Sequence, residues 1–173
     1  KKVFLKCKIY NIFSPITLEY LCEFVKIHPN FYFITDMKDD LFLGAKIIKK
    51  KCPNFIKNFI IQIYHYNQYN FIRNLGFTKI ILTLYRLPEK ERLPDLIVNF
   101  SKSNPIIGIT YWHYLTDVYL NVLNSEKIPS FIHTVNNVTQ MKFFFNKGVS
   151  AIYTDVNDYT IGIYSNKSNE NNY

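Results

Sequence analysis

The sequence predicts an α/β protein in which strands alternate with helices around a parallel sheet. Short apolar, β-rich runs recur along the chain with helical patterns between them, which is typical of such a sheet. We expect six strands, beginning near residues 31, 60, 79, 106, 131 and 151. Residues 131–155 show the repeating unit most clearly, because a strand, a helix and a second strand form the crossover that parallel strands need. An open doubly wound sheet and a barrel both fit this pattern.

Local signals define the individual elements. In the unit at residues 131–155, Asn137 offers a side-chain oxygen to start the helix, and Gly148 tolerates the left-handed conformation that ends it. The other elements follow from the spacing of apolar residues and from breakers such as Pro29. The predicted strands are 31–38, 60–64, 79–85, 106–112, 131–135 and 151–153, and the predicted helices are 18–28, 41–51, 67–75, 94–102, 115–124 and 138–147.

Length and composition indicate one folded domain. The 173 residues are 48% hydrophobic, which is enough for a sizeable core. We expect the domain to cover residues 1–165 and the Asn-rich stretch 166–173 to be a disordered tail. No apolar run is long enough to span a bilayer, and the start lacks the uninterrupted apolar stretch of a secretion signal. Localisation therefore stays open.

The three cysteines, Cys7, Cys22 and Cys52, form no CxxC pair. An odd number of cysteines argues against a disulfide framework, so we expect buried thiols and leave the redox compartment open.

The charge balance is basic, with 21 Lys and Arg against 13 Asp and Glu and a net charge of +8. Such a surface attracts phosphate esters, acidic lipid headgroups or nucleic acid. The densest run, residues 46–51, is also what one solvated helix face would look like. The five glycines form no Gly-rich phosphate loop and no GxSxG motif, which weighs against nucleotide-binding and α/β-hydrolase classes.

Four segments carry a resemblance to a known family. The last unit contains HTVN, a helix and then GVSAIYTD, and the segments ITDMK, IIQIY and IILTLY start at residues 34, 60 and 80. In this order they resemble the third to eighth strands of the glycerophosphodiester phosphodiesterases, where WTVN and GVDGIITD are the usual last motifs. His133 stands at the Trp position. The resemblance implies a (β/α)8 TIM-type barrel that is incomplete here, with about six βα units, so that the chain is a fragment of the barrel.

Asp36 and Lys38 are candidates for the site, because sites in parallel barrels lie at the carboxyl ends of strands. Two positions apart in a strand, both side chains would share one face, where a carboxylate and an ammonium suit a divalent cation and a phosphate oxygen. In the family a Glu at the position of Asp36 holds the metal, so the resemblance implies Mg or Ca as the cofactor. A plain internal ion pair is the alternative.

Two further pairs of positions and one histidine could shape a substrate pocket. Gln62 with Tyr64, and Thr83 with Tyr85, would each share a strand face and could hydrogen-bond a phosphodiester. His133, at the family's Trp position, would pack against substrate. The alternatives are buried structural tyrosines with satisfied hydroxyls and a structural histidine.

The resemblance implies metal-dependent hydrolysis of a small-molecule glycerophosphodiester to an alcohol and glycerol 3-phosphate. Family members carry a catalytic His pair in their first two units, and no HRG-like or HAGG-like segment occurs here. We therefore expect the acid and base upstream of Lys1 and the chain alone to be inactive.

A non-catalytic barrel that binds an anionic headgroup or a glycan is the alternative function. Nucleic-acid binding is suggested by charge alone and is not expected. The basic surface is suited to contact lipid headgroups at a membrane surface. The unpaired outer edges of the first and last strands predict association into an oligomer.

Overall fold

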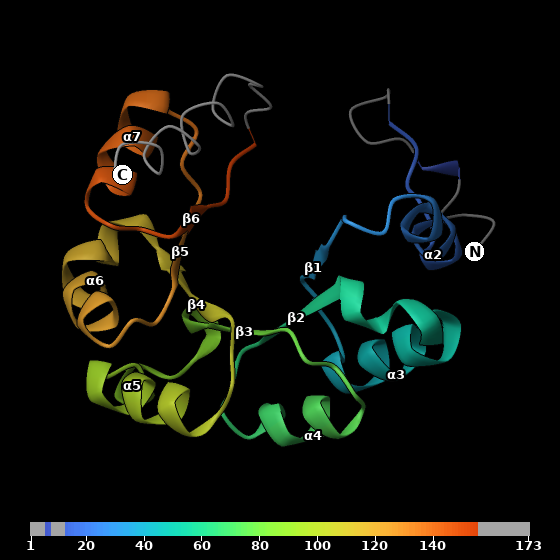
Figure 1. Cartoon of the computed structure of the whole chain (residues 1–173), viewed down its shortest axis with the longest axis horizontal. Helices are drawn as coiled ribbons and strands as arrows, with labels where there is room; N and C mark the ends of the chain where they lie inside the picture. The colour runs from blue at the N-terminus through green and yellow to red at the C-terminus, as the bar shows by residue number, and fades with distance from the viewer. Residues whose placement is uncertain (1–5, 8–12, 156–173) are drawn as a thin grey trace, which may run out of the picture. The chain divides into compact units, whose positions relative to one another are not determined.

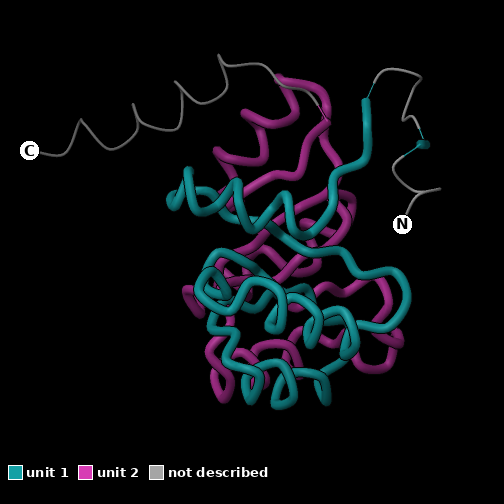
Figure 2. Tube along the Cα trace, turned by 90° about the vertical axis from the view of Figure 1, so that its right-hand side faces the viewer, with its two compact units in different colours: residues 1–81 teal, residues 82–173 magenta. Residues whose placement is uncertain are grey.

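The structure is a computed structural model that describes residues 6–7 and 13–155 of the chain. These residues fall into two compact units, unit 1 within residues 1–81 and unit 2 within residues 82–173 (Figure 2). The predicted disordered tail at 166–173 and the proposed end of the domain at residue 165 lie outside the described residues.

Six strands lie in one sheet in the order of the chain, β1-β2-β3-β4-β5-β6 (Figure 1). The strands are β1 (Phe33–Thr35), β2 (Phe59–Ile63), β3 (Ile80–Thr83), β4 (Gly108–Trp112), β5 (Ser130–His133) and β6 (Ala151–Ile152). The pairs β1·β2, β4·β5 and β5·β6 are parallel. Doubly wound sheets reverse their strand order at a switch point, whereas barrel strands follow one another in sequence. The fold is therefore an incomplete (β/α)8 TIM-type barrel, as the family resemblance implied.

A helix stands between each consecutive pair of strands, apart from short 3₁₀ turns. The α-helices are α2 (Leu18–Ile27), α3 (Leu41–Lys51), α4 (Gln68–Asn74), α5 (Pro94–Ser103), α6 (Thr116–Ser125) and α7 (Val138–Asn146). The 3₁₀ turns are η1 (Pro53–Asn58), η2 (Leu84–Arg86), η3 (Glu89–Glu91) and η4 (His113–Leu115). Within the described residues, no helix is both long enough and apolar enough to cross a membrane.

Unit 1 is built on β2, in which all five residues are buried. Because both faces of the strand are covered, its sequence FIIQI is an almost continuous apolar run. The helices α2 and α3 begin at side-chain caps, with Thr17 accepting from Tyr20 N at 3.3 Å and Asp40 accepting from Leu43 N at 3.0 Å. Gly76, with φ of +96°, ends α4 in a conformation that other residues adopt only with strain.

A disulfide joins Cys22 of α2 to Cys52 at the end of α3, with the two Cα atoms 5.6 Å apart. The expectation of free, buried thiols was wrong, because Cys22 and Cys52 are buried but joined and Cys7 is free but exposed. The error arose because the count of three cysteines says nothing of which two the fold brings together. The packing of α2 against α3 decides that, and Cys7 lies exposed outside the pair.

Unit 2 has its core between β4, β5 and the helices α5 and α6, which lie on one side of these strands in Figure 1. Tyr111 of β4 is fully buried, and its ring lies 5.2 Å from that of Tyr119 on α6. Gly108 starts β4 where a Cβ atom would stand 2.6 Å from the ring of Phe131 on β5. Close packing of these two strands therefore depends on a residue without a side chain.

The last unit forms as predicted. The Asn137 side chain caps α7 by accepting from Gln140 N at 3.0 Å, and Gly148, with φ of +97°, follows the end of the helix.

Candidate functional site

Asp36 and Tyr64 follow the carboxyl ends of two neighbouring parallel strands. β1 ends at Thr35 and β2 at Ile63, with Thr35 opposite Ile61 in the register. The Tyr64 hydroxyl donates a hydrogen bond to Asp36 Oδ1 at 2.6 Å. Lys38 Nζ donates to the second carboxylate oxygen, Oδ2, at 2.5 Å. We call Asp36, Lys38 and Tyr64 the Asp36 cluster.

The contact between Asp36 and Lys38 does not arise in the way that the sequence predicted. Asp36 and Lys38 do not share a strand face, because β1 is only three residues long and both lie in the loop that follows it. The loop turns early because Asp40 caps α3 only a few residues later. The contact between the two side chains is thus a loop contact, supported from β2 by the hydroxyl of Tyr64.

Burial divides the Asp36 cluster into an inner and an outer part. Tyr64 is 3% exposed, whereas the side chains of Asp36 and Lys38 are 43% and 65% exposed. A buried phenol therefore orients a carboxylate that still faces solvent, and an ammonium group is held beside it. Such an arrangement can present positive charge to an anion while keeping the lysine in one place.

Two glutamines flank Tyr64. Gln62 lies in β2, two residues before Tyr64, and is 7% exposed, so this predicted site residue is a buried polar residue of the strand. Gln68, the first residue of α4, was not predicted as part of the site. Its Oε1 accepts from Tyr64 N at 2.7 Å and from His65 N at 3.1 Å. These two bonds hold the backbone at Tyr64 in place. The only sequence signal for this role of Gln68 was a glutamine at the start of a predicted helix.

The fit of a divalent cation to these residues can be judged from the donor set. Hard cations take six or more oxygen ligands, usually from several carboxylates. Within residues 6–7 and 13–155, no group of three or more His, Cys, Asp or Glu side chains is placed to hold a metal ion. Both oxygens of Asp36 also accept hydrogen bonds from protein groups. The described residues thus supply one carboxylate and do not form a cation site by themselves.

Two further predicted residues, Tyr85 and His133, gather with rings that were not predicted as part of the site, in unit 2. The rings of Tyr85 and His133 lie 6.0 Å apart, and Trp112 lies 6.1 Å from Tyr85 and 6.0 Å from His133. Tyr153 adds a ring 6.2 Å from His133 and a hydroxyl 3.4 Å from Thr110 Oγ1. We call Tyr85, Trp112, His133 and Tyr153 the aromatic cluster. All four stand at or just beyond the carboxyl ends of β3 to β6.

The aromatic cluster corrects one sequence prediction. Thr83 and Tyr85 do not share a strand face, because β3 ends at Thr83 and Tyr85 lies in η2. Thr83 is fully buried, whereas Tyr85 joins the aromatic cluster. His133, which was predicted to pack against substrate, is the second predicted residue of this cluster, and packing against substrate stays a prediction.

Arg92 and Trp112 were missed as site residues. The guanidinium carbon of Arg92 lies 5.9 Å from the centre of the Trp112 ring, within the range of a cation–π contact. Arg92 Nε is buried and makes no hydrogen bond in the described part of the chain. A guanidinium N–H group is a strong hydrogen-bond donor. Trp112 stands at the end of a predicted strand, and this position could have marked it as a site residue. Arg92 lies in a loop, where no sequence feature marked it.

The loops after β5 and β6 are tied together by Asn136. Its Oδ1 accepts from Thr154 Oγ1 at 3.1 Å and from Asp155 N at 2.9 Å, and its Nδ2 donates to Asp155 Oδ2 at 3.1 Å. The last Thr-Asp pair therefore closes a loop next to His133. It ties the backbone that follows His133 to the backbone that follows β6.

Two buried tyrosines of unit 2, Tyr111 in β4 and Tyr119 in α6, have raised pKa values. Burial raises the pKa of Tyr111 above 10.0, and the nearby Ser130 hydroxyl offsets part of the rise, although the two hydroxyls do not meet hydrogen-bond geometry. Burial also raises the pKa of Tyr119, and the positive charge of Arg92 opposes it. The Tyr119 hydroxyl donates to the Arg92 carbonyl oxygen at 3.1 Å and so helps to place that arginine.

Comparison with solved structures identifies the fold. A glycerophosphodiester phosphodiesterase from Parabacteroides distasonis ATCC 8503 superposes with a TM-score of 0.69 over 96% of this chain, at 17% identity. The chain has the fold of the glycerophosphodiester phosphodiesterases. A protein from Silicibacter pomeroyi DSS-3 and one from Agrobacterium tumefaciens C58, both assigned as glycerophosphoryl diester phosphodiesterases, give TM-scores of 0.61 and 0.62 at 13% and 12% identity, over 80% and 91% of this chain.

The chain spans 71%, 52% and 66% of the length of these three proteins, respectively. No protein-family model and no curated sequence matches it. The relation to the glycerophosphodiester phosphodiesterase fold therefore rests on the three-dimensional arrangement of the elements.

Proposed function

We propose that this chain is part of a phosphodiesterase that hydrolyses a glycerophosphodiester to an alcohol and glycerol 3-phosphate. The observation that carries the proposal is the Asp36 cluster at the carboxyl ends of β1 and β2, in a fold whose solved examples are named as glycerophosphodiester phosphodiesterases. Sites of (β/α)8 barrels lie at this end of the strands. A lysine held by a carboxylate there is suited to bind a phosphodiester.

The residues of unit 1 have distinct roles in this proposal. The ammonium group of Lys38 neutralises a non-bridging oxygen of the phosphodiester, whose negative charge grows as water attacks phosphorus. Asp36 orients that lysine, and Tyr64 orients Asp36. Gln62, buried in β2, supports the strand beneath them.

In unit 2, the aromatic cluster and Arg92 form a separate set of candidate binding residues. Tyr85 and His133 would pack against the organic part of a bound ester, and Thr83, buried at the end of β3, would help to position Tyr85 two residues later. Departure of the alcohol needs a proton, which a general acid must donate. We assign that acid and the matching base to histidines outside this chain, since the segments that carry them in the resembling family have no counterpart here.

The divalent cation belongs to the same proposal. Asp36 would provide one oxygen ligand, and the remaining ligands would come from residues outside the described part of the chain. A bound Mg²⁺ or Ca²⁺ would supply charge stabilisation at the phosphoryl oxygens.

The test is the release of glycerol 3-phosphate from glycerophosphocholine, measured with a coupled dehydrogenase. We expect no turnover by the isolated 173-residue chain and metal-dependent turnover by the full reading frame that contains it. In the full protein, Lys38→Met should lower kcat/KM about 100-fold, whereas Lys90→Met, at an exposed residue of unit 2, should not. Turnover by the isolated chain would refute the assignment of the acid and base to residues outside it. An inactive full protein would refute the proposed hydrolase function.

A binding function without catalysis is favoured by one observation. The buried Nε–H group of Arg92, beside the Trp112 ring, donates no hydrogen bond within the described residues. Aromatic rings can pack against sugars and lipid headgroups. Calorimetric binding of glycerophosphocholine by a full protein that does not hydrolyse it would establish this alternative.

A further inference from the structure

The net positive charge of the chain lies in unit 1. Residues 1–81 contain 13 Lys and Arg against five Asp and Glu, whereas residues 82–173 contain eight of each. All of the net charge of +8 therefore belongs to unit 1. This asymmetry is a physical argument for an anionic partner on unit 1.

Exposed apolar side chains and lysines meet at the amino ends of the strands of unit 1. Ile27 at the end of α2 is 72% exposed, and Phe31 and Tyr32, just before β1, are 56% and 50% exposed. Lys26 is also exposed on α2. Lys57 lies in η1 and Lys79 lies just before β3. We call Lys26, Ile27, Phe31, Tyr32, Lys57 and Lys79 the basic-aromatic patch.

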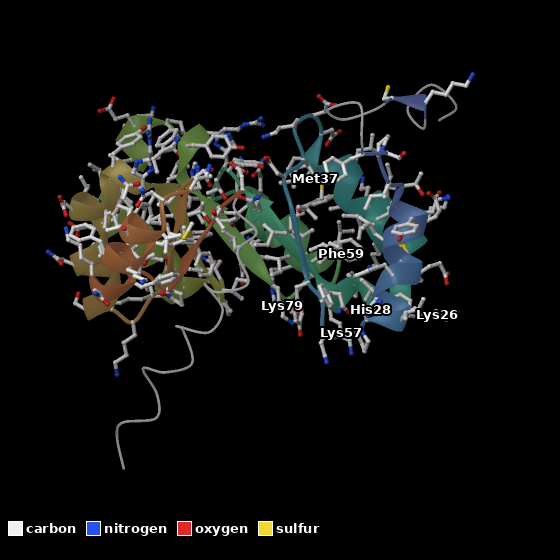
Figure 3. The ribbon with its side chains drawn as sticks, turned by 90° about the horizontal axis from the view of Figure 1, so that it is seen from above. Lys26, His28, Met37, Lys57, Phe59 and Lys79 are labelled. Atoms are coloured by element: carbon white, nitrogen blue, oxygen red, sulfur yellow. A yellow bond between two sulfur atoms is a disulfide. The ribbon has the colours of Figure 1, made fainter. Side chains whose placement is uncertain are left out.

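Direct contacts join the part of the patch formed by Phe31, Tyr32, Lys57 and Lys79, and Lys26 and Ile27 are the last residues of the helix that leads into it. Lys79 Nζ lies 4.7 Å from the centre of the Tyr32 ring and donates to the carbonyl oxygen of Lys57 at 3.3 Å. Asn58 Nδ2 donates to the carbonyl oxygens of Pro29 and Phe31, both at 2.8 Å, so η1 is tied to the turn that carries the aromatic residues. Figure 3 shows Lys26, Lys57 and Lys79 along the same edge of unit 1.

We propose that the basic-aromatic patch binds the surface of an anionic phospholipid bilayer. Lysines attract acidic headgroups, and exposed aliphatic and aromatic side chains beside them insert at the boundary of headgroups and acyl chains. The patch lies at the amino ends of β1 and β2, whereas the Asp36 cluster lies beyond their carboxyl ends. Binding at the patch therefore leaves that cluster accessible, and the inference does not depend on the proposed hydrolase function.

Two other occupants fit the patch less well. A second copy of the same patch would bring like charges together, which opposes symmetric association. Nucleic acid would use the lysines and the rings of Phe31 and Tyr32, but it offers nothing to bury Ile27, the most exposed of these apolar residues. A bilayer surface satisfies the charge and the aliphatic side chain together.

The first experiment is sedimentation of the 173-residue chain with vesicles of phosphatidylcholine, with and without phosphatidylglycerol. We expect binding to the anionic vesicles at low salt, weakening as salt rises, and little binding to phosphatidylcholine alone. Equal affinity for both vesicles, or no affinity for the anionic ones, would overturn the inference. Binding of duplex DNA in place of vesicles, or a dimer that the patch variants dissociate, would also overturn it.

Substitutions then locate the surface. Lys57→Gln and Lys79→Gln should each lower the affinity for anionic vesicles about five-fold, and Ile27→Ser about ten-fold. The matched controls are Lys90→Gln and Val118→Ser, exposed residues of unit 2, which should change nothing. Thermal melting checks that every variant is folded. Equal losses for patch and control variants would show that overall charge, and not this patch, is responsible.

Discussion

Reduction of the Cys22–Cys52 disulfide should destabilise the protein strongly. The bond closes a loop with a sequence separation of 30 residues, between two helices that pack together. For a loop of this size, the chain-entropy relation predicts that the cross-link removes about 12 cal/mol/K from the unfolded state, or about 3.6 kcal/mol at 25 °C. Typical domains are stable by about 5–15 kcal/mol, so the loss would be a large part of the total.

The assay is urea unfolding followed by circular dichroism, with and without a phosphine reductant. Reduction isolates the effect of the cross-link, because the sulfur atoms stay in the core where Cys22 and Cys52 are buried. The variant with both cysteines changed to Ala should lose at least as much stability, since it also loses packing. Cys7→Ser is the control and should behave as the wild type in both conditions.

Two results would refute this reasoning. Alkylation of the unfolded, unreduced chain at all three cysteines would show that the bond does not form. A disulfide that is present but whose reduction leaves the unfolding midpoint unchanged would show that the unfolded chain is already restrained without it.

Three further predictions concern single side chains. Tyr64→Phe removes the hydrogen bond to Asp36 and should lower the free energy of unfolding by about 1 kcal/mol, measured by urea unfolding; an unchanged value would mean that water replaces the phenol. Gly108→Ala would place a methyl group 2.6 Å from the ring of Phe131 and should cost about 1–3 kcal/mol; a variant as stable as the wild type would contradict the close approach. Burial raises the pKa of Tyr111 above 10.0, so the folded state holds that proton to higher pH than the unfolded chain does. Stability should therefore decline as pH rises above 10.0 towards the folded pKa, and less steeply in Tyr111→Phe; parallel pH profiles of the two proteins would count against it.

Local sequence signals predicted the helices well because their ends are set by neighbouring residues. Asp40 and Asn137 cap α3 and α7 through their own side chains, and Gly76 and Gly148 follow helix ends with positive φ. These contacts span three or four residues, so they can be read without the fold.

Strand ends were predicted less well, and this affected the site. The strands β1 and β3 are shorter than expected. Asp36, Lys38 and Tyr85 therefore lie in loops and turns and not on the predicted strand faces. Where a parallel strand stops depends on its partner, which lies a whole βα unit away in the sequence. The sequence therefore predicted strand faces for side chains that the structure places in loops and turns.

The sequence by itself determined the alternation of strands and helices, the order of the motifs and the polar residues that follow the strands, because these depend on nearest neighbours and apolar spacing. Tertiary structure alone decided that Cys22 meets Cys52, that Tyr64 orients Asp36 and that Arg92 lies beside Trp112. Each of these contacts joins residues at least 20 positions apart. Such pairings are set by how helices and strands pack, and no local pattern encodes that packing.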